Sequence, residues 1–321
     1  MRCLRADKGG EVTEYLTLLA GVVCAGIGGE LFVRGTVGIA SALRIAPGII
    51  AATIAAFATS SPELTVSITA ALEGTPQIAL GDALGSNVVN VALILAVAVL
   101  IVPIAVPRDA IRRDFPAALL VPVIVGVLLI DGSLSRMDGL LLIALFLGWL
   151  VAVVREARRQ RSAAAEVLAE HNPARAVIES IGGLALLIVA GRLIVSGATT
   201  IATTYGVEPF LIGATIVALG TSVPELATAI ISGLRGHEEV GLGTILGSNI
   251  FNGLLIVGTA ASISPISIGL SEVAPALVLG LAALALTFPP SSGVVGRWRG
   301  ILLLGVYVVY LAVMAQWGHG A

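Results

Sequence analysis

The chain consists of long uncharged apolar runs joined by short polar connections, and this pattern limits what it can fold into. A run of about 17–25 apolar residues is long enough to cross a bilayer as an α-helix. Only 12% of the 321 residues are charged, whereas a soluble domain carries about 25%. We therefore expect an all-α membrane protein. Ten runs qualify as spanning helices: residues 12–33, 47–72, 79–102, 115–131, 138–154, 175–204, 209–234, 241–262, 272–288 and 299–316.

The composition argues against several other classes of protein. A net charge of −2 offers no basic surface for nucleic acid. Two cysteines, Cys3 and Cys24, form neither a zinc motif nor a disulfide framework. The three histidines lie outside the apolar runs and no HExxH motif occurs, which argues against a metalloprotease or another intramembrane enzyme. We expect no cofactor and no obligate protein partner, and the lipid bilayer is the expected surrounding.

The distribution of basic residues predicts the orientation. Thirteen of the eighteen Lys and Arg residues fall in connections on one side of the ten spans, and four fall on the side of the N-terminus. Basic residues concentrate on the cytoplasmic side of membrane proteins. We therefore expect a multi-pass protein of the cell membrane with both termini outside, and with segment 155–174 as a short cytoplasmic linker.

Two motifs occur twice with the same spacing. Thr-Ser-x-Pro-Glu ends at Glu63 and again at Glu225, and Leu-Gly-Ser-Asn-x-x-Asn ends at Asn90 and again at Asn252; both pairs are 162 residues apart. Each half of the chain, 12–154 and 175–316, holds five predicted spans, so the second half enters the membrane from the opposite side. Such inverted repeats are typical of secondary transporters, whose substrate site lies near the midplane where the repeats meet.

Glu63 and Glu225 lie well inside predicted spans, with no basic residue near them in the sequence. A carboxylate at the centre of a bilayer costs about 2.5–3.5 kcal/mol or more. A cation taken from solution is the natural counter-charge, and the alternative is that each Glu is protonated and hydrogen-bonded. The same position in both repeats favours a cation site.

The residues just before each Glu strengthen that interpretation. Thr59 and Ser60 precede Glu63 by four and three residues, which brings their hydroxyls to one helix face, and the second repeat has Thr and Ser at the same spacing. Pro62 should free the carbonyl of Ala58, and the second Pro that of the residue four positions earlier. Hydroxyl, carbonyl and carboxylate oxygens are the ligands that Ca²⁺ prefers. A plain proline kink is the simpler alternative.

The second motif supplies further polar groups on one helix face. Ser86 and Asn90 are spaced i and i+4, as are Ser248 and Asn252. Such side chains can bind ligands or form hydrogen bonds between helices, and their common offset with the Glu motif favours ligands.

Three other charged residues receive weaker interpretations. Glu30 and Arg192 occupy equivalent positions with opposite charge, and could pair or lie at a water-exposed level. Asp82 has Thr244 as its counterpart, and is interpreted as a residue of a helix start.

These motifs resemble those of the sodium/calcium exchanger family of the cation/calcium antiporter superfamily, in its prokaryotic form. The resemblance implies two inverted five-helix repeats and Ca²⁺ bound by the carboxylates of Glu63 and Glu225. It implies Na⁺ sites that use the carbonyls of Ala56 and Ala218, with Asn90 and Asn252 between the cation positions. The hydroxyl ligands that it implies are those of Thr59, Ser60, Ser86, Thr221, Ser222 and Ser248.

This chain departs from the family pattern at one important position. Members that exchange sodium for calcium have Asp where it has Asn252, which leaves two carboxylates and brings Na⁺ dependence into question. We expect a secondary antiporter that exchanges Ca²⁺ for Na⁺ by alternating access. A Ca²⁺/H⁺ antiporter is the alternative, and a passive cation channel is less favoured because channels use rotationally repeated pores.

Overall fold

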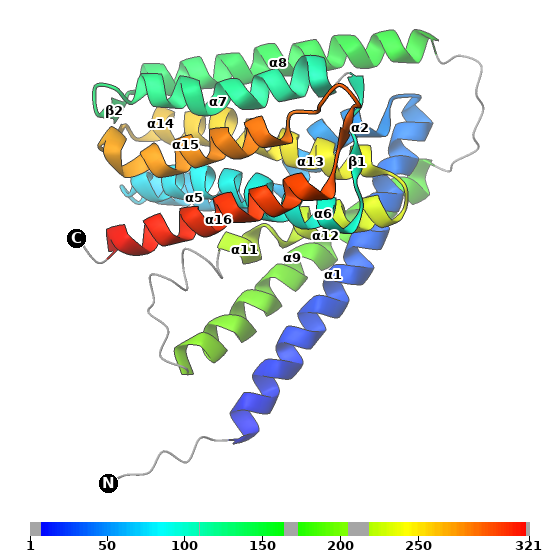
Figure 1. Ribbon diagram of the computed structural model, residues 1–321, viewed down its shortest axis with the longest axis horizontal. Helices are drawn as coiled ribbons and strands as arrows, with labels where there is room; N and C mark the ends of the chain where they lie inside the picture. The colour runs from blue at the N-terminus through cyan, green and yellow to red at the C-terminus, as the bar shows by residue number, and fades with distance from the viewer. Residues whose placement is uncertain (1–7, 109, 164–172, 205–217, 319–321) are drawn as a thin grey trace.

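The structure is a computed structural model that describes residues 8–108, 110–163, 173–204 and 218–318. It is a helix bundle with two pairs of two-residue strands (Figure 1). The first half contains α1 (Lys8–Leu43), α2 (Pro47–Ile50), α3 (Ala56–Thr59), α4 (Ser61–Leu72), α5 (Pro76–Val88), α6 (Ala96–Ile101), β1 (Ile104–Ala105), α7 (Phe115–Leu128), β2 (Ser133–Leu134) and α8 (Arg136–Ala163). The second contains α9 (Pro173–Thr204), α11 (Ala218–Thr221), α12 (Val223–Leu234), α13 (Glu238–Ile250), α14 (Val257–Ile263), β3 (Ile266–Ser267), α15 (Leu270–Thr287), β4 (Val294–Val295) and α16 (Arg297–Gly318).

Within the described residues, seven helices are long and apolar enough to cross a membrane. An eighth candidate is a pair of helices, Pro47–Thr59 and Ser61–Leu72, which passes the same test when the two are taken together and has a bend of 46° between them. These eight coincide with eight of the ten predicted spans, and confirm an all-helical protein with many membrane spans. The predicted span 115–131 corresponds to α7, which has 14 residues. The predicted span 209–234 lies partly outside the described residues, which cover it as α11 and α12.

Two long helices form the centre of the bundle. Of the apolar stretch in Glu238–Ile263, 94% is buried inside the protein, and of that in Pro76–Ile101, 72%. Each contains π-helical turns, at Val89–Leu95 and at Phe251–Ile256. In the outer helices α1, α8, α9 and α16 only 17–28% of the apolar stretch is buried, as in helices that face lipid. Figure 1 shows α1 and α9 side by side, inclined to the remaining helices.

The two halves of the chain are joined by two pairs of short strands, and each pair contains one strand from each half. β1 pairs with β4, with Ile104 opposite Val295, and β2 pairs with β3, with Leu134 opposite Ile266. Both ladders are antiparallel, and each joins a strand of the first half to a strand of the second. Two helix connections of the first half are therefore hydrogen-bonded to two helix connections of the second.

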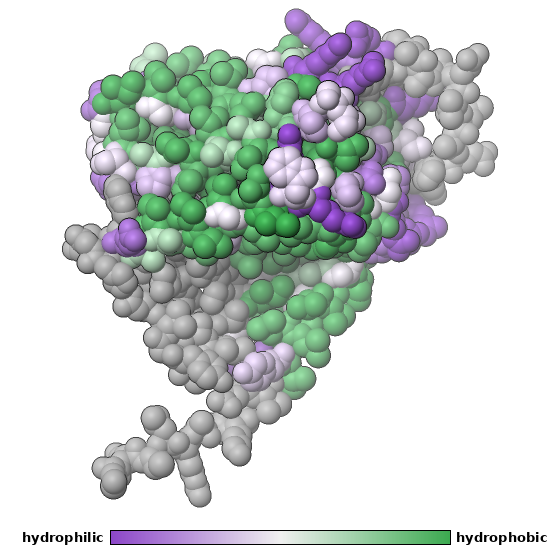
Figure 2. Space-filling view, viewed as in Figure 1, coloured by the Kyte–Doolittle hydropathy of each residue, from purple (hydrophilic) through white to green (hydrophobic). Residues whose placement is uncertain are grey.

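The surface agrees with a bilayer environment. Figure 2 shows apolar residues over most of the visible face, with hydrophilic residues concentrated mainly at the right-hand end of the view. Exposed large side chains on the outer helices include Ile178, Ile301 and Val308, at 70%, 64% and 63% exposure. An apolar band of this kind is stable only against lipid.

Close packing between the halves depends on two glycines, Gly243 and Gly247, on one face of α13. A Cβ atom on Gly243 would lie 2.6 Å from the carbonyl oxygen of Gly48, and one on Gly247 would collide with the carbonyl oxygen of Ala52. Glycine at these positions therefore lets α13 rest against the backbone of the first half, as small residues do between membrane helices.

We predict that Gly243→Ala destabilises the protein, because the new methyl group meets backbone that cannot move aside freely. Overpacking of this kind costs about 1–3 kcal/mol. The matched control is Gly81→Ala, since Gly81 is the equivalent position of α5 and a Cβ there meets nothing within 4 Å among the described residues. The measurement is the thermal unfolding midpoint of the purified protein. Equal midpoints for the two variants would contradict this account of the packing.

Candidate functional site

The first Glu motif lies at a break between two helices. α3 ends at Thr59, Ser60 has φ −86° and ψ 7°, and α4 begins at Ser61. Pro62 stands in the first turn of α4, where its missing N–H is not needed. Glu63 therefore lies in the first turn of a helix, where the positive end of the helix dipole favours a carboxylate.

The second repeat builds the same arrangement from the same sequence pattern. Ser222 has φ −90° and ψ 11°, Pro224 follows in the first turn of α12, and Glu225 occupies that turn as well. The break between α11 and α12 therefore repeats the one between α3 and α4. Two interrupted helices thus present one carboxylate each.

The structure brings the predicted site residues of both repeats into the same buried region. Glu63 and Glu225 are each 1% exposed, although both carry an ionisable group. The other described side chains of the predicted set are also at most 2% exposed: Ala56, Thr59, Ser60, Ser86, Asn90, Ser222, Ser248 and Asn252. Ala218 and Thr221 belong to α11, but their side chains lie outside the described part.

Contacts around Glu225 link the two repeats. The Ser248 hydroxyl donates a hydrogen bond to Glu225 Oε1 at 3.2 Å, which joins α13 to α12. The carboxylate also lies close to the hydroxyls of Thr59 and Ser60 from the first repeat. Glu63 is close enough to Glu225 for their charges to repel. The two carboxylates therefore share one environment, and a cation between them would remove that repulsion.

The site contains an unusual number of oxygen atoms that lack a hydrogen-bond partner. Buried polar atoms in proteins are nearly always hydrogen-bonded, yet seven predicted site residues each have one buried oxygen without a partner among the described residues. These atoms are Ser60 Oγ, Glu63 Oε2, Ser86 Oγ, Asn90 Oδ1, Ser222 Oγ, Glu225 Oε2 and Asn252 Oδ1. They come from both repeats and from both motifs. Such a set of oxygens is suited to a hard cation such as Ca²⁺ or Na⁺.

The carbonyl group that Pro62 was expected to leave without a hydrogen bond has a partner in the structure. The carbonyl of Ala58 is not free, because the Ser61 hydroxyl donates to it at 2.7 Å. Proline therefore removes one hydrogen bond and the neighbouring serine replaces it. In the second repeat Val223 occupies the position of Ser61 and has no hydroxyl. The carbonyl of Ala56 accepts the N–H of Ser60 at 2.9 Å and the Thr59 hydroxyl at 3.2 Å.

Sequence reasoning missed a pair of asparagines that join the repeats. Asn87 Nδ2 donates to the carbonyl of Asn249 at 3.2 Å, and Asn249 Nδ2 donates to the carbonyl of Asn87 at 3.2 Å. Asn90 Nδ2 also donates to Asn249 Oδ1 at 3.1 Å. Asn87 and Asn249 are each the first Asn of a Leu-Gly-Ser-Asn-x-x-Asn motif, 162 residues apart. Their equivalent positions in the two motifs were the sequence feature that could have identified this pair.

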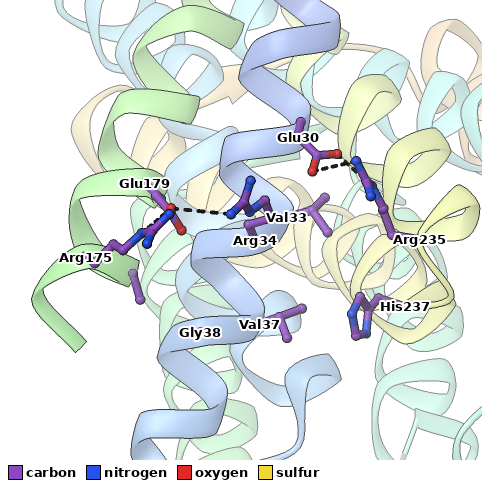
Figure 3. A pocket seen from close by; sticks show the side chains of 10 residues that line it. Glu30, Val33, Arg34, Val37, Gly38, Arg175, Glu179, Arg235 and His237 are labelled. Atoms are coloured by element: carbon purple, nitrogen blue, oxygen red, sulfur yellow. Dashed lines mark hydrogen bonds and ion pairs between the residues drawn. The ribbon is translucent and has the colours of Figure 1, made fainter. Parts of the chain in front are cut away.

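Asp82 and Glu30 lie in different surroundings from those expected from the sequence. Asp82 is not at a helix start, because α5 begins six residues earlier at Pro76; its Oδ2 atom is buried without a hydrogen-bond partner in the described chain. Glu30 pairs with Arg235 at 2.8 Å, as Figure 3 shows, and not with Arg192. Across the described residues, no three His, Cys, Asp or Glu side chains are placed to hold a metal ion together, so a cation between the two carboxylates would need hydroxyl and amide oxygens as further ligands.

Comparison with known proteins gives a consistent result over nearly the whole chain. The family model described as sodium/calcium exchanger protein matches residues 13–155 and again residues 176–316. CaxA of Alkalimonas amylolytica is 41% identical over 255 residues, which cover 77% of this chain and 80% of CaxA. The sodium/calcium exchanger MaX1 of Methanosarcina acetivorans is 26% identical, over 94% of this chain and 98% of MaX1.

The fold matches a solved exchanger as well. The sodium-calcium exchanger NCX_Mj superposes with a TM-score of 0.81 at 28% sequence identity, covering 94% of this chain and 99% of that one. The inner membrane protein YrbG of Escherichia coli (strain K12) is 38% identical, over 84% of this chain and 87% of YrbG. The interrupted helices with their paired carboxylates, and these matches along both halves, establish that the chain belongs to the sodium/calcium exchanger protein family of membrane transporters.

Proposed function

We propose that this protein is a secondary active antiporter that exchanges Ca²⁺ for Na⁺ at a single site between its two halves. The observation that carries the proposal is the set of seven buried oxygens without hydrogen-bond partners, which includes one from each of Glu63 and Glu225. Leaving such atoms unsatisfied costs about 1–3 kcal/mol each. A bound cation would satisfy several of them at once.

We further propose that the chain forms ten spanning helices as two inverted five-helix repeats, residues 12–154 and 175–316, joined by the cytoplasmic linker 155–174. Three observations support this division. The helices that follow the two breaks, α4 and α12, begin 162 residues apart, at Ser61 and Val223. Each strand pair joins one half to the other. The family model matches the chain twice, once in each half.

The proposed Ca²⁺ position lies between Glu63 and Glu225, because two carboxylates neutralise one divalent cation. The proposed Na⁺ ligands are the hydroxyls of Thr59, Ser60, Ser86, Thr221, Ser222 and Ser248, and the carbonyls of Ala56 and Ala218, with Asn90 and Asn252 between the cation positions. The Ala56 carbonyl would become available when the Thr59 hydroxyl, which now donates to it at 3.2 Å, rotates away.

Exchange follows from competition for these oxygens. Empty, the site holds two buried carboxylates that repel each other, which is costly inside a membrane. Ca²⁺ or Na⁺ relieves this repulsion, and occupancy by one ion excludes the other. If the site opens to one side at a time only when it is loaded, the gradient of one ion drives the other and no ATP is needed.

The proposed location is the cell membrane, with both termini outside. Support comes from the basic residues, since Arg34, Arg175 and Arg235 of the predicted cytoplasmic side line one cavity at the same end of the bundle. A positive end of this kind is typical of the cytoplasmic face.

We predict that Glu63→Gln and Glu225→Gln each abolish Ca²⁺ transport. Removing one partner of a buried charge interaction costs about 3–5 kcal/mol, which is a loss of affinity of roughly 100-fold or more. The measurement is labelled Ca²⁺ uptake into proteoliposomes, with size-exclusion chromatography to check folding. The matched control is Glu73→Gln, at the exposed end of the same helix, which should transport normally. Normal transport by either site variant would refute the proposed site.

The neutral amide of Asn252 makes H⁺ a specific alternative to Na⁺, because a site with two carboxylates can be neutralised by two protons. We predict that an outward Na⁺ gradient drives labelled Ca²⁺ uptake into proteoliposomes, whereas a matched H⁺ gradient does not. Uptake driven by H⁺ alone would show that the protein is a Ca²⁺/H⁺ antiporter that uses the same carboxylates.

A passive channel makes a different prediction from either antiporter. Because an exchanger carries ions in both directions through one site, unlabelled Ca²⁺ inside the vesicles should accelerate entry of labelled Ca²⁺ when no Na⁺ is present. A channel would show no acceleration under zero membrane potential, and that result would exclude the exchange mechanism.

A further inference from the structure

A charged cavity of about 760 Å³ lies away from the carboxylate site, where α1, α9 and the turn between α12 and α13 meet. Figure 3 shows its charged groups: Arg34 and Arg175 both point toward Glu179, and Arg235 points toward Glu30. His237 lines the same cavity. None of these residues belongs to the proposed cation site, so the cavity has a separate chemistry.

The lining of the cavity carries more positive than negative charge. Arg235 uses both oxygens of Glu30, through Nε at 2.9 Å and Nη2 at 2.8 Å. Glu179 offers the same oxygen, Oε1, to Arg175 at 2.9 Å and to Arg34 at 4.0 Å. The contact of Arg34 is too long for a hydrogen bond. Three guanidinium groups thus face two carboxylates, and the charge of Arg34 is the least well compensated.

The three arginine side chains are also more than half exposed. The side chains of Arg34, Arg175 and Arg235 are 52%, 69% and 59% exposed. Arginine presents a planar fork of N–H donors that matches a phosphate group, and it can hold a carboxylate at the same time because it has five donors. An anion with phosphate oxygens therefore fits the excess charge of this cavity.

Apolar surface beside the cavity distinguishes a lipid from a soluble phosphate. Ile178 and Ile181 follow Arg175 on α9 and are 70% and 64% exposed, and Leu234, which directly precedes Arg235, is 63% exposed. In a protein with many membrane spans such side chains contact acyl chains. Arg175 lies in the first turn of α9 and Arg235 directly follows the end of α12, and the ends of membrane helices lie near the lipid headgroups. Basic pockets between membrane helices at this depth bind anionic headgroups.

We propose that this cavity binds the phosphodiester headgroup of an anionic phospholipid, with the acyl chains lying along the neighbouring apolar side chains. The bound headgroup contacts Arg34 of α1, Arg175 of α9 and Arg235 after α12. It therefore joins the pair α1 and α9 to the rest of the bundle. This site is independent of which ions the protein exchanges.

The test is native mass spectrometry of the purified protein with phosphatidylglycerol as the probe. The double variant Arg34→Gln, Arg175→Gln should bind phosphatidylglycerol at least about tenfold more weakly than the unmodified protein, since hydrogen bonds between charged groups are stronger than neutral ones. The matched control is Arg108→Gln, Arg112→Gln, which removes the same charge from exposed positions outside the cavity and should leave binding unchanged. Equal loss in both double variants, or no loss in the first, would overturn the proposal.

Two further arms identify the source of the phosphate. Phosphatidylcholine has the phosphodiester but no net charge, and should bind more weakly than phosphatidylglycerol; equal binding would contradict the role of the excess positive charge. Glycerol phosphate has the headgroup without acyl chains and should not displace the lipid at equal concentration. Displacement would mean that the cavity takes a soluble phosphate, and the lipid proposal would be wrong. If the double variant does not fold, Arg34→Gln alone serves the same comparison, because its ion pair is the longest of the three.

Discussion

Two carboxylates buried within an apolar helix bundle, each 1% exposed and close enough to repel the other, set the central constraint on this protein. Isolated buried charge is costly inside a membrane, and no basic side chain among the described residues pairs with either Glu63 or Glu225. Each carboxylate lies in the first turn of a helix that begins after a break, where the helix dipole partly compensates it. In the function that we propose, a cation supplies the remaining compensation, which would explain why the fold keeps charge at its centre.

The packing around the two carboxylates serves to hold oxygen atoms in place. Gly243 and Gly247 let α13 pack against the backbone of the first half, and Ser248 of the same helix donates a hydrogen bond to Glu225. The reciprocal bonds between Asn87 and Asn249 fix the two central helices against each other. Oxygens that are held rigidly but lack hydrogen-bond partners favour the ion that can fill the space between them.

The sequence predicted the parts of this site that depend on residue type and spacing. The position of Glu63 and Glu225 well inside two apolar runs predicted that both would be buried, and the spacing of Ser86 and Asn90 predicted a common face of α5 and its continuation. The sequence did not predict contacts that depend on how segments pack in three dimensions. The donation from Ser61 to the Ala58 carbonyl depends on the conformation after the helix break, and the pairing of Asn87 with Asn249 depends on how two central helices cross. The strand pairs β1–β4 and β2–β3 likewise join segments more than 130 residues apart. The local sequence pattern of a strand does not determine which distant strand it pairs with.

The proposed exchange requires that Ca²⁺ and Na⁺ share one site, and equilibrium binding of labelled Ca²⁺ to the purified protein tests this most directly. The titration is repeated at increasing Na⁺ concentration. We predict one Ca²⁺ per chain, with an apparent dissociation constant that rises steadily as Na⁺ increases, until Ca²⁺ is fully displaced. Ca²⁺ that stays bound at saturating Na⁺, or an apparent dissociation constant that levels off, would show that the two ions occupy separate sites and would contradict the account.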